Sequence, residues 1–130
     1  QHPPLRRQRQ MCIRDRSFSA WRHPGLAAPW PAVRYLQEDA PWIPGHAWTE
    51  ANTRPGGLRT GSMMTALEAV ERGLGVGVVL DCLVATRSAD LVPVARGVDA
   101  ADLWVVQRQE NRTFARIRAV VEWLGAIPWG

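Results

Sequence analysis

The sequence predicts an α/β fold, a parallel or mixed sheet flanked by helices, and two stretches carry that prediction. Residues 62–80 have the pattern of an amphipathic helix, a glycine stop and a strand that is apolar on both faces. Residues 102–124 have the pattern of a second strand followed by a second amphipathic helix. Strands that alternate with helices in this way are typical of α/β domains.

The helix predicted for residues 62–73 has a recognisable start and end. Ser62 stands at the N-cap position, where its hydroxyl can accept a hydrogen bond from a first-turn amide. Gly73 stands where the helix should end, because glycine enters the left-handed region at little cost. The apolar residues of this stretch follow the spacing of one helix face: Met63, Ala66, Leu67, Val70 and Leu74. Residues 76–80 are then expected to form a strand covered on both sides.

The elements before residue 60 have weaker patterns. Pro31 can open a helix as its first residue, so residues 31–40 are predicted to be a helix that Pro41 ends. Val33, Leu36 and Ala40 would share one face of that helix. The remaining assignments are a loop at 17–30, a turn at 41–46, a short strand at 46–52 and a loop rich in proline and glycine at 53–59.

The elements after residue 80 complete the predicted order. They are a short helix or loop at 81–88, a brief strand at 91–94, a loop at 97–101, a strand at 102–108 and a last helix. Thr113 is expected to cap that last helix, and Gly125 and Pro128 to stop it. Its predicted apolar face comprises Phe114, Ile117, Val120, Val121 and Leu124. Trp104 and Trp123 fall on positions that predict burial in the core.

Composition restricts the class of protein. A chain of 130 residues that is 46% hydrophobic suits one small globular domain, and no apolar run approaches the ~20 residues of a membrane helix. No secretory signal is recognisable. The net charge of +4 lies entirely in residues 1–16, which hold five arginines and one aspartate, so the rest of the chain is neutral. A domain that reads DNA should carry its own basic face, and residues 17–130 predict none.

Residues 1–16 differ from the rest of the chain, and three interpretations stay open. They are a solvated tail, a basic arm that binds phosphate, or a non-native segment. The stretch RRQRQMCIRDR resembles translated sequencing-adaptor sequence, which favours the third interpretation and a native chain that begins near Ser17. We therefore divide the chain into a basic tail at 1–16 and a truncated domain at 17–130. Cys12 and Cys82 either pair or, more simply, stay reduced in the cytoplasm.

The sequence offers little for catalysis, and we expect no enzyme, cofactor or metal site. His46 has no second histidine or cysteine at ligand spacing. The GLGVG motif at 73–77 follows a helix and opens a strand, the reverse of a dinucleotide-binding loop. Glu68 and Glu71 are typical of a solvated helix face, and Cys82 of a small core residue. Four tryptophans in loop-rich sequence either line a cleft or cover an exposed edge: Trp21, Trp30, Trp42 and Trp48.

The best candidate for a binding site is the start of the helix at residues 62–73. Thr60, Gly61, Ser62 and Met63 bring amides and two hydroxyls to a helix N-terminus, which can hold a carboxylate or a similar anion. The alternative is that the same groups only cap the helix.

The order of these elements resembles the C-terminal part of the effector-binding domain of LysR-type transcriptional regulators. The matching pieces are Gly73-Leu74-Gly75 before a buried strand, a short Leu91-Val92 strand, the Leu103-Trp104 pair, and Arg116 with Arg118 in the last helix. The resemblance covers about residues 31–127. One departure is Asp81, where the family often has proline after the buried strand.

The resemblance implies a periplasmic-binding-protein-like (type 2) fold, here truncated at its N-terminus, with two subdomains around a cleft that holds a small, often anionic metabolite. It places Ser62, with its neighbours Thr60, Gly61 and Met63, at that cleft. It also implies a cytoplasmic parent that forms homo-oligomers and contacts DNA only through a winged helix-turn-helix absent from this sequence, with no membrane partner. The alternatives are a solute-binding protein of the same broad fold working in transport, a small enzyme, or a fragment that is inactive alone.

Overall fold

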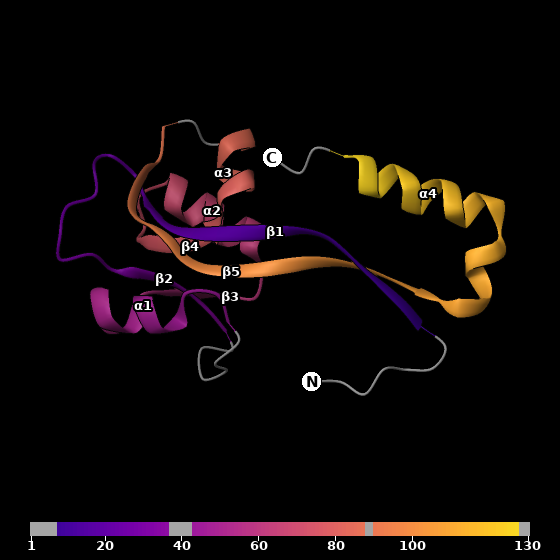
Figure 1. The fold of residues 1–130 in the computed structure, drawn as a ribbon. Coiled ribbons are helices and arrows are strands. Elements are labelled where there is room, and N and C mark those ends of the chain that lie inside the picture. The colour runs from indigo at the N-terminus through magenta and orange to yellow at the C-terminus, as the bar shows by residue number, and fades with distance from the viewer. Residues whose placement is uncertain (1–7, 37–42, 88–89, 128–130) are drawn as a thin grey trace. The chain divides into compact units, whose positions relative to one another are not determined.

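The computed structural model describes residues 8–36, 43–87 and 90–127 (Figure 1). The strands are β1 (Gln8–Arg22), β2 (Ala32–Tyr35), β3 (Leu58–Thr60), β4 (Val76–Leu80) and β5 (Val92–Arg108). The helices are α1 (His46–Asn52), α2 (Met63–Glu71), α3 (Asp81–Arg87) and α4 (Ala115–Ala126), with a 3-10 turn η1 (Gln109–Thr113) before the last. Within the described residues, no helix has the length and apolar character needed to cross a bilayer.

The strands form one mixed sheet with the order β3-β2-β4-β1-β5. β2 is parallel to both of its neighbours, with Val33 opposite Leu58 on β3 and opposite Gly77 on β4. β1 runs antiparallel to β4 and brings Ala20 opposite Val78. A mixed sheet flanked by helices confirms the predicted fold class.

Both faces of the sheet are covered, as the apolar sequence of β4 predicts. Val79 packs with Leu67 and Val70 of α2 in one core cluster, whereas Val78 packs with Phe18 in a second cluster. Successive side chains of a strand point to opposite faces, so the two clusters lie on opposite sides of the sheet. Figure 1 shows α2 and α3 on one side of the strands and α1 on the other.

The segment from α2 to β4 has the predicted structure. The Ser62 hydroxyl caps α2 by accepting a hydrogen bond from the Thr65 amide, and Gly73 ends the turn after the helix with φ +74°. Leu67 and Val70 are fully buried beneath the helix. Burial of two such side chains stabilises the fold by about 1.5–3 kcal/mol each.

Two predicted elements before α2 are wrong in type. Residues 32–35 form β2 rather than a helix, because the Pro31 carbonyl accepts a hydrogen bond from Val76 (2.8 Å) and sets this segment beside β4. The end of that predicted helix, including Ala40 and Pro41, lies outside the described residues. Residues 46–52 form the helix α1 rather than a strand. The turn at Gly45, with φ +70°, starts this helix, and Thr49 ends it by accepting from Thr53.

The prediction of a loop at residues 17–30 is wrong for its first part. Phe18 to Trp21 belong to β1 and pair with β4, so a segment that we expected to be a loop lies inside the sheet. The alternation explains this position, because Phe18 and Ala20 enter one core cluster while Trp21 enters the other. Residues 8–16 belong to the same strand. That residues 1–16 are a non-native segment stays a prediction.

The segment after β4 follows the prediction in part. Residues 81–87 form α3, one of the two structures expected there. The two predicted strands and the loop between them are instead one continuous strand, β5. Gly97 lies inside it with φ +60°, so the glycine bends the strand rather than ending it.

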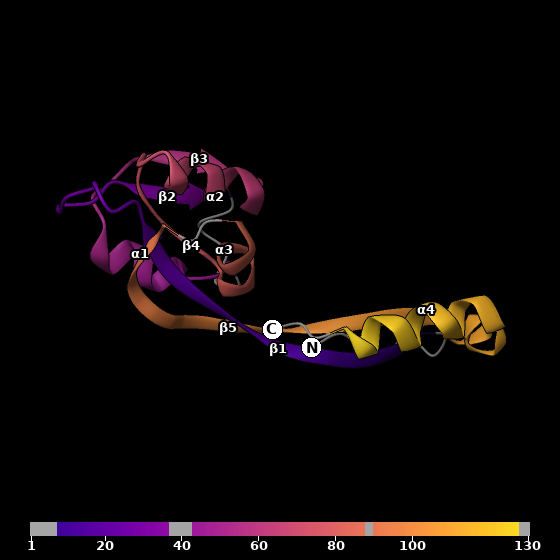
Figure 2. The same cartoon turned by 90° about the horizontal axis from the view of Figure 1, so that it is seen from above.

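The chain divides into two compact units, residues 17–100 and residues 1–16 with 101–130. In the second unit, η1 turns the chain so that α4 runs back against the direction of β5 (Figure 2). The predicted cap and stop of α4 are wrong, since Phe114 is its N-cap residue and Gly125 lies within it; Pro128 lies outside the described residues. No residue of α4 is buried among the residues described, and Trp123 is 63% exposed rather than in the core. The predicted burial of Trp104 falls on a side chain that the structure does not describe.

Candidate functional site

The four predicted site residues form one short segment in which Gly61 and Ser62 are exposed and Thr60 and Met63 are half-buried. Thr60 is the last residue of β3, Gly61 and Ser62 form the turn after it, and Met63 is the first residue of α2. Thr60 pairs with Tyr35 at the end of the parallel strand β2, so the segment lies at the carboxyl edge of parallel strands. Open α/β sheets commonly bind ligands at that edge.

The hydrogen bonds of this segment leave part of the helix start free. The Ser62 amide donates to the Thr60 hydroxyl at 3.2 Å, and the Thr65 amide donates to the Ser62 hydroxyl at 3.4 Å. The first four amides of a helix have no acceptor inside it. In the described part of the chain, the amides of Met63 and Met64 have no acceptor outside the helix either. Capping therefore accounts for Ser62 but leaves two amide donors available.

Leu36 forms an apolar flank beside these amides. Its own amide donates to the Thr60 carbonyl at 3.0 Å, while its side chain is 62% exposed. A methyl group placed on Gly61 would lie 3.3 Å from Leu36 Cδ1, so the leucine side chain reaches over the turn. The segment therefore combines free donors with an adjacent apolar surface.

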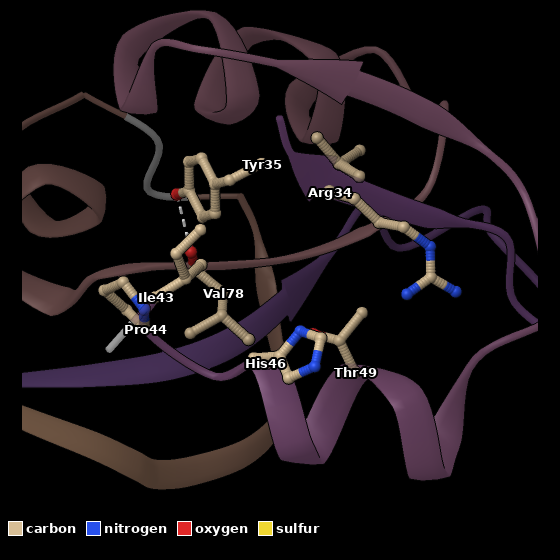
Figure 3. A pocket seen from close by; sticks show the side chains of 8 residues that line it. Arg34, Tyr35, Ile43, Pro44, His46, Thr49 and Val78 are labelled. Carbon is tan, nitrogen blue, oxygen red and sulfur yellow. Dashed lines mark hydrogen bonds between the residues drawn. The ribbon is translucent and has the colours of Figure 1, made fainter. Parts of the chain in front are cut away.

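A small hollow lies on the α1 side of the sheet, away from these four residues (Figure 3). Its volume of about 10 Å³ is close to that of one water, so it has no room for a metabolite. Tyr35 lies at this hollow and donates its hydroxyl to the Val78 carbonyl at 2.9 Å. Burial raises the pKa of Tyr35 to about 12, because the charged tyrosinate is disfavoured away from water.

Arg34 is the most buried charged side chain near this hollow, at 6% exposed, and sequence analysis did not identify it. Its guanidinium points away from Tyr35 in Figure 3. It forms an ion pair with Glu50 and donates to the carbonyls of Gly56 and Arg54, both at 2.9 Å. These bonds fix the loop before β3 onto β2 and α1, so Arg34 has a structural role.

A larger hollow lies beside α3, with a volume of about 370 Å³. Trp21 from β1, Asp81 and Val84 from α3, and Arg96 from β5 line it. Of the two interpretations of the loop tryptophans, Trp21 therefore fits a cleft. Trp30 and Trp48 pack against the core cluster on the α1 side, and Trp42 lies outside the described residues.

Two acidic side chains of α2 that the sequence drew attention to form ion pairs with arginines. Glu68 pairs with Arg72 at 3.1 Å and is exposed, which agrees with a solvated helix face. Glu71 pairs with Arg87 at 3.5 Å but is half-buried with its Oε1 away from water, so the prediction is wrong for Glu71. Cys82 is a free, half-buried thiol; the side chain of Cys12 lies outside the description. No group of three or more histidine, cysteine or acidic side chains is placed to hold a metal ion within these residues.

Comparison with known proteins places this geometry in a known fold. A family model described as the LysR substrate binding domain matches residues 21–127. The effector domain of AmpR from Pseudomonas aeruginosa is 14% identical with a TM-score of 0.65, over 93% of this chain and 64% of that one. The regulatory domain of CrgA from Neisseria meningitidis is 15% identical with a TM-score of 0.73, over 96% of this chain and 71% of that one.

A full-length regulator shows how much of such a protein the chain represents. LysG from Corynebacterium glutamicum, solved with bound effector Arg, is 16% identical with a TM-score of 0.67. The likeness covers 97% of this chain but only 49% of LysG. At these identities the solved structures show the fold alone. No curated protein matches the chain.

Proposed function

The chain belongs to the LysR substrate-binding domain family, and we propose that it senses a small effector for a LysR-type transcriptional regulator. This family favours a sensing role over the alternative of a transport protein. In the proposed parent, which is cytoplasmic and oligomeric, DNA is contacted by a separate domain. The family is a substrate-binding domain, which supports a binding role rather than an enzymatic one.

The proposed effector site is the segment from Thr60 to Met63. The observation that carries it is the pair of amides at Met63 and Met64 that have no acceptor at an exposed helix start. The Ser62 hydroxyl accepts one hydrogen bond and keeps its own proton for a ligand. Three donors thus converge at the carboxyl edge of the sheet, beside the apolar Leu36 side chain.

These donors favour an anionic effector. The N-terminus of a helix carries a partial positive charge, so a carboxylate there is stabilised by about 0.3–1 kcal/mol at exposed positions. The backbone amides add direct hydrogen bonds to the same group. We therefore propose that the effector presents a carboxylate or a similar anion to Met63 and Met64 and an apolar part to Leu36.

The test compares two substitutions of nearly equal shape, Ser62→Asn and Ser62→Asp. Both residues cap helices about as well as serine, so both variants should keep the wild-type stability within about 0.5 kcal/mol. Either side chain would accept from the first-turn amides as a cap does, but only the aspartate adds a negative charge that repels an anion.

Acetate, succinate and benzoate serve as probes, measured by calorimetry on the 130-residue chain. We expect at least one of them to bind, and Ser62→Asp to weaken that binding roughly tenfold more than Ser62→Asn. Equal binding by the two variants would show that the effector does not reach this helix start. Preference for a cationic probe of similar size would contradict the anionic class.

A further inference from the structure

The hollow beside α3 has the size and lining of a ligand pocket. Its volume of about 370 Å³ lies in the range of small-molecule sites, which is roughly 300–1,000 Å³. Its apolar wall is formed by Trp21, Val84, Leu91 and Pro93. Three of these, Trp21, Val84 and Leu91, belong to the core cluster beneath α2. Packing therefore holds the wall in place without a ligand.

Asp81 provides a fixed negative charge in this hollow. The Ser17 hydroxyl donates to its Oδ2 at 2.7 Å, and the Trp21 indole donates to its Oδ1 at 3.3 Å. A carboxylate has about four acceptor sites, so each oxygen can accept a further hydrogen bond. Asp81 stands immediately after a buried strand, and its first two bonds orient it toward the indole.

Arg96 provides a positive charge over the same indole. Its guanidinium carbon lies 5.6 Å from the centre of the Trp21 ring, a distance typical of a cation–π contact. Within residues 8–36, 43–87 and 90–127, the guanidinium has no hydrogen bond and no carboxylate partner. Its planar donors are thus available to a ligand carboxylate.

The indole of Trp21 contacts both charges, and yet they do not pair with each other among the residues described. A molecule that carries an ammonium and a carboxylate on an apolar body would satisfy both charges and pack against the apolar wall. We propose that this hollow binds a small zwitterion with an apolar side chain, of which a free aromatic α-amino acid is the simplest example. The site is distinct from the helix start at Ser62 and does not depend on the function proposed for it.

The indole N–H of Trp21 gives a direct signal, because it donates to Asp81 inside the hollow. Its resonance is assigned in a proton–nitrogen spectrum of the full 130-residue chain by its loss in Trp21→Phe. L-phenylalanine is the probe. Two matched compounds each lack one charge: 3-phenylpropanoate lacks the ammonium, and 2-phenylethylamine lacks the carboxylate. We expect L-phenylalanine to shift the resonance saturably, and each single-charge compound to bind roughly tenfold more weakly.

Two charge-removing variants and one control complete the experiment. Arg96→Gln and Asp81→Asn should each weaken L-phenylalanine binding roughly tenfold. Arg72→Gln removes an equal charge from the exposed surface of α2 and should leave the binding unchanged. Unshifted backbone resonances of β4 show in each case that the fold is intact.

Three results would overturn the proposal. The first is no saturable shift with L-phenylalanine up to about 10 mM. The second is equal affinity for all three compounds, which would mean that the apolar wall alone binds them. The third is an Arg96→Gln variant that binds like Arg72→Gln. If the Ser62 variants show no effect on anion binding while L-phenylalanine still binds as expected, only the effector site proposed at Ser62 is refuted.

Discussion

Replacing the buried Arg34 by methionine should destabilise the chain by about 3 kcal/mol. The guanidinium is 6% exposed and donates to two backbone carbonyls and to Glu50. Removing one partner of a buried ion pair typically costs about 3–5 kcal/mol. The lower value applies here because Glu50 is 52% exposed and water can solvate it once Arg34 is gone. Methionine fills most of the volume of the arginine stem, so the lost hydrogen bonds dominate the effect.

Urea unfolding followed by circular dichroism measures this change as a lower midpoint at an unchanged slope. The matched control is Glu50→Gln, which removes the exposed partner and leaves the carbonyl bonds in place. We expect that substitution to cost less than Arg34→Met, because the new amide oxygen can still accept from the guanidinium and the two carbonyl bonds remain. A loss below about 1 kcal/mol for Arg34→Met, or equal losses for the two variants, would refute the structural role of the guanidinium.

Two further predictions concern the face of the sheet that α1 covers. Tyr35 is the chain's one tyrosine, and its pKa rises from 10.0 to about 12 through burial, so tyrosinate absorbance should appear near pH 12 in the folded chain and near pH 10 in urea. Because the folded pKa is the higher one, stability present below pH 10 should fall as pH rises toward 12; coincident midpoints would contradict this. Gly45→Ala should cost about 2–4 kcal/mol in urea unfolding, since Gly45 has φ +70° and its new methyl would lie 2.5 Å from Val78 Cγ2. The loss should shrink when Val78→Ala is added, and a wild-type midpoint for Gly45→Ala alone would exclude the clash.

The part of the fold that the sequence predicts is the part specified by local signals. Ser62 and Gly73 mark the start and end of α2 through their own chemistry, a hydroxyl acceptor and a left-handed backbone, and both have these roles in the structure. β4 is apolar at every position except Gly77, which is the pattern of a strand buried on both faces.

The errors arise where distant pairing decides the structure. Residues 31–40 have apolar residues at helical spacing, yet the bond from Val76 to the Pro31 carbonyl makes a strand of residues 32–35. β1 contains serine and arginine among its apolar residues, so it has the composition of a loop. Its place in the sheet depends on β4, about 60 residues later in the chain. Tertiary context of this kind overrides local propensity.

The two candidate sites also differ in how far local sequence reveals them. Thr60 to Met63 are consecutive, so local sequence is enough to recognise a helix start with capping hydroxyls. Trp21, Asp81 and Arg96 come from three elements and meet only when the sheet forms. The departure at Asp81 from the family's usual proline is the one signal in the sequence that points to this hollow.

The position of β1 between β4 and β5 has a consequence for synthesis on the ribosome. Phe18 leaves the ribosome before Leu80, its partner in the sheet, and about 60 residues separate them. At ~5–20 residues per second, the nascent β1 therefore waits about 3–12 s without a partner. Its apolar side chains and open backbone are accessible throughout that delay, which makes β1 the segment most in need of chaperone protection while the chain is being translated.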